Sequence, residues 1–189
     1  MDRLFTDETF KQQDFATNGF PAGEYENCKF LHCDFSNVSF AGCIFVECAF
    51  SDCNLSMVQL NKTAMRDVRF VGCKMLGLHF DTCNDFGFEV SFDGCNLQHA
   101  SFYNRNLKKL QCKNTILREV DFTLADLSQA VLQDCDLIGA TFDNTNLEKA
   151  DLRKATGYII DPERNKIKKA KFSLADVAGL LMKYDITIE

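Results

Sequence analysis

A large apolar residue returns at every fifth position between residues 25 and 80, and this spacing constrains the fold more than any other feature. The apolar centres are Tyr25, Phe30, Phe35, Phe40, Phe45, Phe50, Leu55, Leu60, Met65, Phe70, Met75 and Phe80. A period of five is neither the 3.6-residue period of a helix nor the two-residue period of a strand. The position two residues before each centre holds a small or branched residue, so both side chains share one face of a short extended leg. The other positions are mostly polar, which predicts a corner after each leg and a chain wound into a coil.

The five-residue spacing is interrupted once. Asp85 stands where a centre is due, and the next clear centre is Phe92, twelve residues after Phe80, which is two units plus two residues. We expect a loop or bulge within residues 81–91, because a shift that is not absorbed locally would turn the inward side chains outward. The spacing then continues to Leu152, and Arg105 is the one clear misfit at a wall position.

A slower period lies over the first. Phe102 and Phe122 are 20 residues apart, as are Phe30 and Phe50, and 20 residues of five-residue units imply four legs per turn. Equivalent legs then stack at the strand spacing of roughly 4.8 Å and form a solenoid. The predicted core stack consists of Phe30, Phe50, Phe70, Phe102, Phe122 and Phe142.

The spacing predicts three parts of the chain. Residues 1–24 keep the aromatic spacing but carry polar residues at the wall positions, so we expect a polar N-terminal cap. Residues 25–154 form the coil, and residues 155–189 form extended segments and a short helix that Ser173 caps together with Asp176. This helix either closes the open end of the rod or meets the same helix of a second chain. Its apolar stripe consists of Leu174, Val177, Leu180, Leu181 and Tyr184.

Composition places the chain among soluble globular proteins, with 46% hydrophobic and 25% charged residues. No signal-like N-terminus and no run near the roughly 18 apolar residues of a membrane span is present, so we expect a cytoplasmic protein that does not contact a membrane. Nine of the ten cysteines share one phase of the repeat. Buried packing is the favoured interpretation, with metal binding or disulfides as the alternative; no Cys-x-x-Cys motif supports zinc.

The net charge of −6 is concentrated at the start, since residues 1–60 carry nine acidic and three basic side chains. This balance argues against direct nucleic-acid binding, which needs clustered Lys and Arg. His32, His79 and His99 lie in different units, and the glycines are scattered. We therefore expect no enzymatic activity, no cofactor and no metal site.

Several units share one signature, A-(D/N)-(L/F)-x-x, as in residues 125–129, 140–144 and 150–154. Over residues 25–154 the chain resembles the pentapeptide repeat family. The resemblance implies an all-β, right-handed quadrilateral β-helix, here with a short C-terminal α-helix. The chain looks like the cytoplasmic, Qnr-like branch, whose members resemble B-form DNA in size and acidity, dimerise through their C-terminal ends and protect type II topoisomerases from quinolones or toxins. The resemblance therefore implies a homodimer formed through the C-terminal helix.

Two functions stay open at this point. The first is a non-enzymatic binding or scaffold protein whose rod surface engages a protein partner, and the loop at Asp85, Phe86 and Phe88 is the candidate contact. We expect these two aromatic rings to be tucked in. The alternative is a DNA-mimicking protein that binds DNA gyrase or topoisomerase IV and either protects it from quinolones or inhibits supercoiling. Its candidate acidic surface consists of Asp34, Glu47, Asp52, Asp67, Asp121, Asp126 and Asp136. The plainer interpretation of these residues is a solvated face that keeps the rod soluble.

Overall fold

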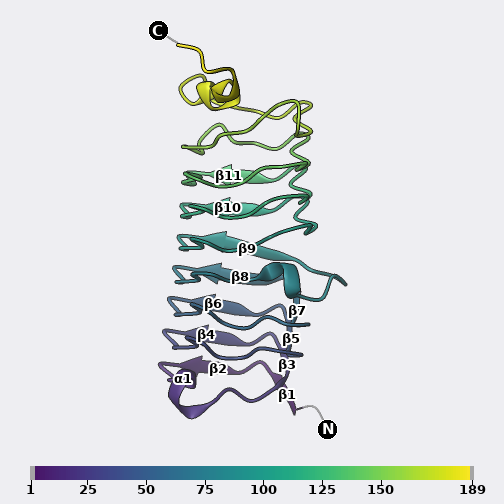
Figure 1. Ribbon diagram of the computed structural model, residues 1–189. Coiled ribbons are helices and arrows are strands. Elements are labelled where there is room, and N and C mark those ends of the chain that lie inside the picture. The colour runs from purple at the N-terminus through teal and green to yellow at the C-terminus, as the bar shows by residue number, and fades with distance from the viewer. Residues whose placement is uncertain (1–2, 188–189) are drawn as a thin grey trace.

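The computed structural model describes residues 3–187, which form a stack of parallel coils with the two ends of the chain at opposite ends of the stack (Figure 1). One sheet contains, in order, β1 (Arg3–Thr6), β3 (Gly23–Glu26), β5 (Ile44–Val46) and β7 (Ala64–Arg66). The second sheet contains, in order, β11 (Val131–Gln133), β10 (Gln111–Lys113), β9 (Val90–Asp93), β8 (Val68–Val71), β6 (Ala49–Ser51), β4 (Lys29–Leu31) and β2 (Thr9–Lys11). Every paired strand is parallel to its neighbour, so the fold is a parallel β-solenoid in which the seven-stranded sheet spans seven coils.

Helix is scarce. The one α-helix described, α1 (Phe15–Asn18), has a single turn, and the 3₁₀ helices are η1 (Phe80–Thr82), η2 (Val177–Leu180) and η3 (Met182–Tyr184). Within residues 3–187, none of the helices has the length and apolar character needed to cross a bilayer. The right hand of the coil and its quadrilateral cross-section stay predictions.

Pairing between coils has a register of 20 residues that changes once. Phe30 pairs with Phe50 and Phe50 with Phe70, at a separation of 20 residues, whereas Phe70 pairs with Phe92, at a separation of 22. Two extra residues are therefore present in the coil that ends at β9.

The apolar centres fill the interior as columns of rings. On the seven-stranded sheet the ring centroids of Phe30 and Phe50 are 4.5 Å apart, and those of Phe50 and Phe70 are 5.2 Å apart, with nearly parallel planes. A second column runs through Phe102 and Phe122, whose centroids are 5.5 Å apart. The predicted stack is thus two separate columns on different legs. Its members are Phe30, Phe50 and Phe70 in one column and Phe102, Phe122 and Phe142 in the other.

The corners have their own backbone geometry. The second residue after many centres has a positive φ, for example 50° at Asn27, 52° at Asp52 and 61° at Lys149. Asn, Asp and Gly adopt this left-handed region more readily than other residues. This preference explains why so many corners are polar, and why Gly72 stands at one of them.

The N-terminal segment forms the first coil, since β1 pairs with β3 and β2 pairs with β4. Phe15 is buried, and the ring of Phe20 lies 4.9 Å from that of Phe40 and 5.4 Å from that of Phe35. The aromatic residues of this segment therefore cover the end of the core, although their wall positions are polar.

The C-terminal segment differs from the predicted one in two respects. Coils continue beyond residue 154, because Asn146 forms a bridge with Lys166 and Asp151 forms one with Lys171. The predicted α-helix is replaced by η2 and η3, whose hydrogen bonds join residues three apart. The carbonyl of Gly179 accepts a hydrogen bond from Ile160 N at 3.0 Å, so contact with the last coil holds this segment in its tighter turns.

All ten cysteines are buried and unpaired. Burial raises the pKa of the Cys48 thiol to about 11, and the same cause raises that of Cys83 to about 12. Thiols of this kind are neutral at pH 7 and pack as small apolar groups. In residues 3–187, no group of three or more His, Cys, Asp or Glu side chains is arranged to hold a metal ion.

Candidate functional site

The extra residues form a loop that leaves the wall between β8 and β9. Asn84 N donates to Thr63 O at 2.9 Å, and Glu89 N donates to Met65 O at 2.9 Å. The two acceptors are two residues apart on the coil below, whereas the two donors are five residues apart on this coil. Residues 85–88 therefore cannot follow the wall. In Figure 1 this segment extends beyond the edge of the stack. Gly87 has a φ of 69°, which allows the chain to reverse at the tip.

Arg105, one coil further along, holds the loop from inside. Its side chain is 4% exposed, and its guanidinium donates to Cys83 O and Asn84 O at 3.1 Å each, and also to the Asp85 carboxylate. A buried guanidinium needs such acceptors, because a buried charge without partners is strongly unfavourable. The misfit at a wall position and the interruption of the repeat are therefore one feature: the arginine occupies the space that the displaced loop leaves.

The two aromatic residues of the loop have opposite environments. Phe88 is half-buried, with its ring 6.3 Å from that of Phe80 and the guanidinium of Arg105 4.3 Å above its centroid. Phe86 is 76% exposed, and the guanidinium of Arg66 lies 5.3 Å from its ring centroid. The tucked position that we expected for both rings holds for Phe88 and is wrong for Phe86, because the turn at Gly87 directs Phe86 away from the core.

A groove of about 450 Å³ lies beside the loop. Phe88 and Glu89 line one side, and residues 106–111 of the next coil line the other. Lys108 and Lys109 stand at its rim and are exposed. The groove exists because the displaced loop does not fill the corner between the two coils.

Several of the predicted acidic residues accept hydrogen bonds from backbone amides. The carboxylates of Asp34 and Asp126 accept hydrogen bonds from Ser36 N at 2.7 Å and Ser128 N at 2.8 Å. The Ser36 amide also holds the pKa of Asp34 below its usual range. Asp121 and Asp136 accept from the amide two residues on in the same way. These carboxylates close Asx turns, which gives the aspartate of the repeat signature a structural role.

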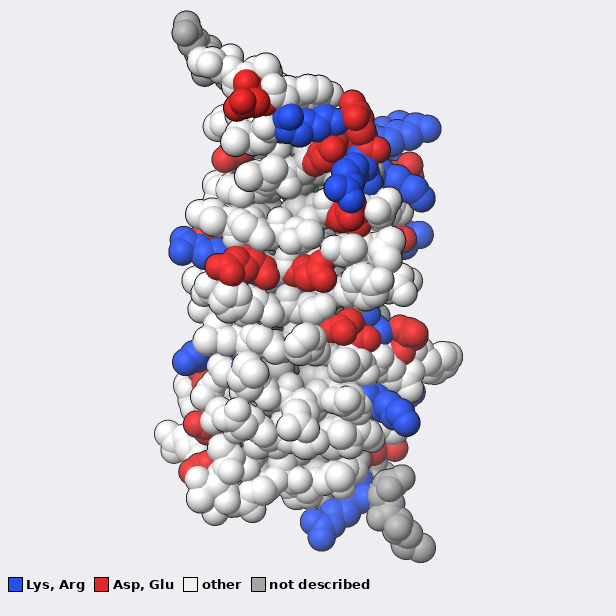
Figure 2. Space-filling model, in the orientation of Figure 1, with Lys and Arg blue, Asp and Glu red and all other residues white. Residues whose placement is uncertain are grey.

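The other predicted acidic residues stand at corners and do not form one surface with the first group. Glu47 and Asp67 occupy the same corner on neighbouring coils, whereas Asp52 lies on another corner, 3.8 Å from His32. Figure 2 shows acidic side chains in small groups separated by uncharged surface on one side of the rod. The charge is therefore distributed over several sides of the stack.

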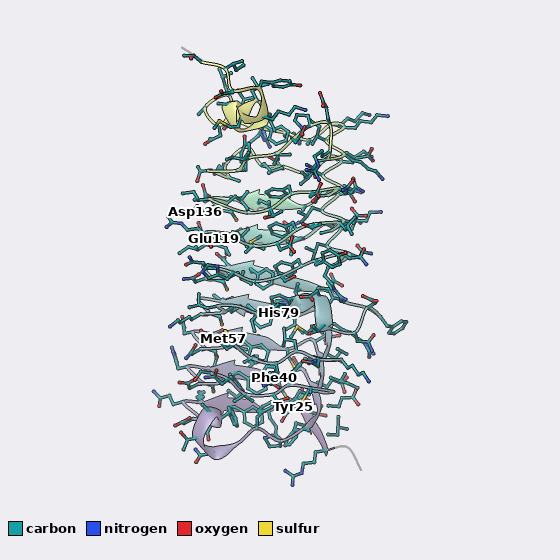
Figure 3. All side chains as sticks on the ribbon, viewed as in Figure 1. Tyr25, Phe40, Met57, His79, Glu119 and Asp136 are labelled. Atoms are coloured by element: carbon teal, nitrogen blue, oxygen red, sulfur yellow. The ribbon has the colours of Figure 1, made fainter. Side chains whose placement is uncertain are left out.

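The histidines are not grouped. His79 lies 3.3 Å from Asp81 on one coil, and His99 lies 3.1 Å from Glu119 on the next coil. Figure 3 shows Glu119 and Asp136 on neighbouring coils at one side of the view, with His79 several coils lower. Nothing in this arrangement brings a nucleophile, a base and an acid together.

The predicted apolar stripe at the C-terminus is only partly covered. Val177, Leu180 and Leu181 are half-buried against the last coil, whereas Leu174 is 91% exposed. Tyr184 donates to Glu163 at 3.0 Å, and Lys183 lies 2.6 Å from Asp161. Polar contacts therefore fasten the segment, and its apolar side chains lie partly in solvent.

Among solved structures, the chain is similar to a trypsin-treated form of QnrB1, described as a plasmid-mediated fluoroquinolone resistance protein. The two share 18% identity over 100% of this chain and 99% of that chain, with a TM-score of 0.47. The chain is also similar to HetL, a pentapeptide repeat protein involved in heterocyst differentiation regulation in Nostoc sp. strain PCC 7120. There the identity is 16% over 92% of this chain and 85% of that chain, with a TM-score of 0.35.

A pentapeptide repeat protein from the Arabidopsis thaliana thylakoid lumen shares 21% identity over 66% of this chain and 65% of its own, with a TM-score of 0.28. No curated protein sequence matches the chain. Family models do match: the model of the pentapeptide repeat region covers residues 24–86, and the model of pentapeptide repeats in eight copies covers residues 88–123 and 121–156. Together with the five-residue legs and their stacking, these matches show that the chain belongs to the pentapeptide repeat family.

Proposed function

We propose that this protein is a non-catalytic binding protein that engages a protein partner through the loop at residues 84–89. The observation that carries the proposal is the exposed ring of Phe86, held on a loop whose base is fixed by a buried arginine. Exposed aromatic side chains are typical of protein contacts, because they bury a large apolar area on binding.

The loop is ordered before any partner arrives. Its two ends bond to the coil below, its carbonyls bond to Arg105, and Phe86 N bonds to Asn84 Oδ1 at 2.9 Å. A rigid loop loses little conformational entropy on binding, which favours affinity. The groove next to Phe88 offers space for a side chain of the partner, with Lys108 and Lys109 at its rim.

A non-catalytic role agrees with the remaining surface. The exposed histidines pair with single carboxylates on separate coils, and side chains fill the interior of the rod. Catalysis needs convergent polar groups around a bound substrate. The cytoplasmic location stays a prediction.

The experiment is a comparison of affinity captures with the full chain as bait. Wild type, Phe86→Ser and Leu124→Ser are compared; Leu124 is also an exposed apolar corner residue, 44% exposed, but lies on another leg. We expect a partner that is retained by wild type and Leu124→Ser, lost with Phe86→Ser, and bound again when both proteins are purified. Equal capture by all three baits would exclude the loop as the contact.

A second candidate function is mimicry of DNA toward DNA gyrase or topoisomerase IV. The rod shape and the net charge of −6 support it. The use of several carboxylates in Asx turns and their distribution over several sides weaken it. A supercoiling assay with purified gyrase, with and without a quinolone, tests it. Mimicry of this target predicts either inhibition of supercoiling or relief of quinolone inhibition at micromolar protein, and no change in either would reject it.

We also propose a homodimer formed through the C-terminal end. Leu174, Met182 and Ile186 are all more than half exposed there, which leaves an apolar surface on the last coil. Burial of such a surface favours association of two like ends. Light scattering of Leu174→Glu combined with Met182→Glu should show a monomer where wild type shows a dimer; an unchanged mass would reject this contact.

A further inference from the structure

One side of the rod carries opposite charge in its two halves. It is formed by the leg that precedes the seven-stranded sheet in each coil, and we call it the first-leg surface. Its nine legs are residues 4–7, 24–27, 44–47, 64–67, the loop 84–89, 106–109, 126–129, 146–149 and 166–169. The first four overlap β1, β3, β5 and β7, whose wall residues Arg3 and Gly23 lie outside the legs, and the last four are joined by bridges between Asn106, Asp126, Asn146 and Lys166. The loop of the proposed function therefore stands in the fifth position of nine, at the centre.

The charges on the two sides of the loop are equal and opposite. The first four legs carry five carboxylates and one arginine, a net charge of −4. The last four carry six lysines and two carboxylates, a net charge of +4. Within residues 3–187, none of these six lysines takes part in an ion pair. Successive coils are roughly 4.8 Å apart, which is less than the Debye length of about 8 Å at physiological salt, so the charges of neighbouring legs act together and each half presents its net charge. Within the basic half, the leg 126–129 carries Asp126 and no lysine.

The corner of this surface shows the inversion most clearly. Eight residues at the same corner all have positive φ, from 50° to 66°, and the amides of six of them donate to a carbonyl of the next coil in the same way. Read from the N-terminal end they are Asp7, Asn27, Glu47 and Asp67 before the loop, and Lys109, Gln129, Lys149 and Lys169 after it. When a second copy faces this corner in the opposite direction, Asp7 lies opposite Lys169 and Asp67 lies opposite Lys109.

We propose that two copies of this chain pair side by side and antiparallel through the first-leg surface, with the two-fold axis passing through the loop. A two-fold axis in this position brings the acidic half onto the basic half of the second copy, and corner onto corner, because the surface has four legs on each side of the loop. One facing pair of legs is unfavourable, since 44–47 and 126–129 are both net acidic. Isologous contacts of this kind require a surface that is complementary to itself when reversed. A second copy fits the observed charge order better than a nucleic acid, which would be repelled by the acidic half.

Phe86 lies where the axis passes. A residue near a two-fold axis meets its own copy, and Phe86 lies on the projecting loop with 76% of its area exposed. Contact between two such rings would supply an apolar centre surrounded by charged pairs, which is the usual anatomy of an interface. The pairing covers the loop, so it excludes the partner contact proposed above, and the two interactions compete.

The test uses the full chain with Leu174→Glu and Met182→Glu, which removes the proposed end-to-end contact. Sedimentation at low salt measures the association of three versions of this background. The first has acidic side chains in both halves of the corner, with Lys109→Glu, Lys149→Glu and Lys169→Glu. The second has basic side chains in both halves of the corner, with Asp7→Lys, Glu47→Lys and Asp67→Lys. The third is a control with the same change of charge on other legs, with Lys62→Glu, Lys74→Glu and Lys154→Glu.

We expect each of the first two versions to associate at least about tenfold more weakly than the background, and an equimolar mixture of the two to form a heterodimer. The control should associate as the background does, and salt from about 50 mM to about 500 mM should weaken all pairing. Circular dichroism shows whether each version is folded. A background that stays monomeric at low salt, a mixture of folded variants that stays monomeric, or a control as weak as the charge variants would overturn the proposal.

Discussion

The coils before the loop and the coils after it fill the same cross-section with different side chains. Before the loop, consecutive centres from Tyr25 to Phe50 are all aromatic, with parallel rings between coils and edge contacts within a coil. After the loop, one aromatic column remains, from Phe102 to Phe142, and most other centres are leucine beside alanine walls. The comparison shows that the fold requires apolar volume at every fifth residue, whereas the identity of the side chain is free to change.

The largest expected effect comes from the aromatic half. Phe50 is fully buried between Phe30 and Phe70, and Phe50→Ala should lower the free energy of unfolding by about 3–5 kcal/mol, since it removes ring contacts and leaves a cavity. Urea denaturation measures the loss. Lys29→Ala, on the exposed side of β4, is the control and should change stability by less than about 0.5 kcal/mol.

The matching change in the other half is Leu127→Ala. Leu127 is also fully buried, and we expect a loss of about 2–5 kcal/mol, smaller than for Phe50→Ala because fewer atoms are removed and the alanine walls lie closer. The same urea series measures it. A larger loss at Leu127 than at Phe50 would show that the leucine half, not the aromatic half, holds the rod together.

At the boundary between the halves, Arg105→Met should lower stability by about 2–3 kcal/mol, because the Cys83 and Asn84 carbonyls lose a charged donor inside the wall. The loop should then be cleaved by chymotrypsin at Phe86 more rapidly than in wild type. Arg153→Ala removes an exposed ion pair with Asp151 and should leave both stability and cleavage nearly unchanged. Equal cleavage of all three proteins would mean that Arg105 does not hold the loop.

One carboxyl in each half should contribute to the response of the rod to acid. The pKa of Asp34 is lowered by the Ser36 amide, and that of Asp151 is lowered by its hydrogen bond with Arg153. A carboxyl whose folded pKa is depressed adds stability above its unfolded pKa, near 4, and this contribution is lost as pH falls through the folded pKa. Asp34→Asn and Asp151→Asn should therefore each lose less stability than wild type on acidification from about pH 5 to about pH 3.

High salt should distinguish the two causes of the lowered pKa, at Asp34 and at Asp151. The exposed ion pair of Asp151 is screened at high ionic strength, so the difference between Asp151→Asn and wild type should shrink in about 1 M NaCl. The difference for Asp34→Asn should persist, because an amide donor is not screened in the same way. Urea denaturation across this pH range at two salt concentrations measures both, and identical salt responses would contradict the assigned causes.

The smallest expected effect on stability is at the loop tip. Phe86→Ser should change the free energy of unfolding by less than about 0.5 kcal/mol, since the ring makes few contacts with the rod. Phe88→Ser should lower it more, because that ring packs on Phe80 and Arg105. Thermal unfolding compares the two variants, and equal losses of stability would mean that the Phe86 ring packs on the rod as the Phe88 ring does.

Much of the fold follows from spacing alone. A period of five with an apolar centre predicts legs and corners, a period of 20 predicts the coil, and the distance from Phe80 to Phe92 predicts two extra residues. Arg105 was visible only as a misfit, because its partners lie more than 20 residues away and contribute backbone carbonyls, which leave no trace in composition. The prediction of a C-terminal α-helix was wrong, because the contact of Gly179 with the last coil outweighs local helix propensity.

By itself, then, the sequence determined which residues point inward, how many residues make a coil and where the repeat is interrupted, since these depend on local periods. Only the tertiary structure decided what the interruption does: it turned Phe86 outward, tucked Phe88 in and placed the buried Arg105 against the ring of Phe88. The physical reason is that the five-residue period indicates whether a residue faces inward or outward. The environment of a residue in the displaced loop depends instead on the coils above and below it. The same stacking places acidic and basic legs, distant in the chain, on one continuous side of the rod.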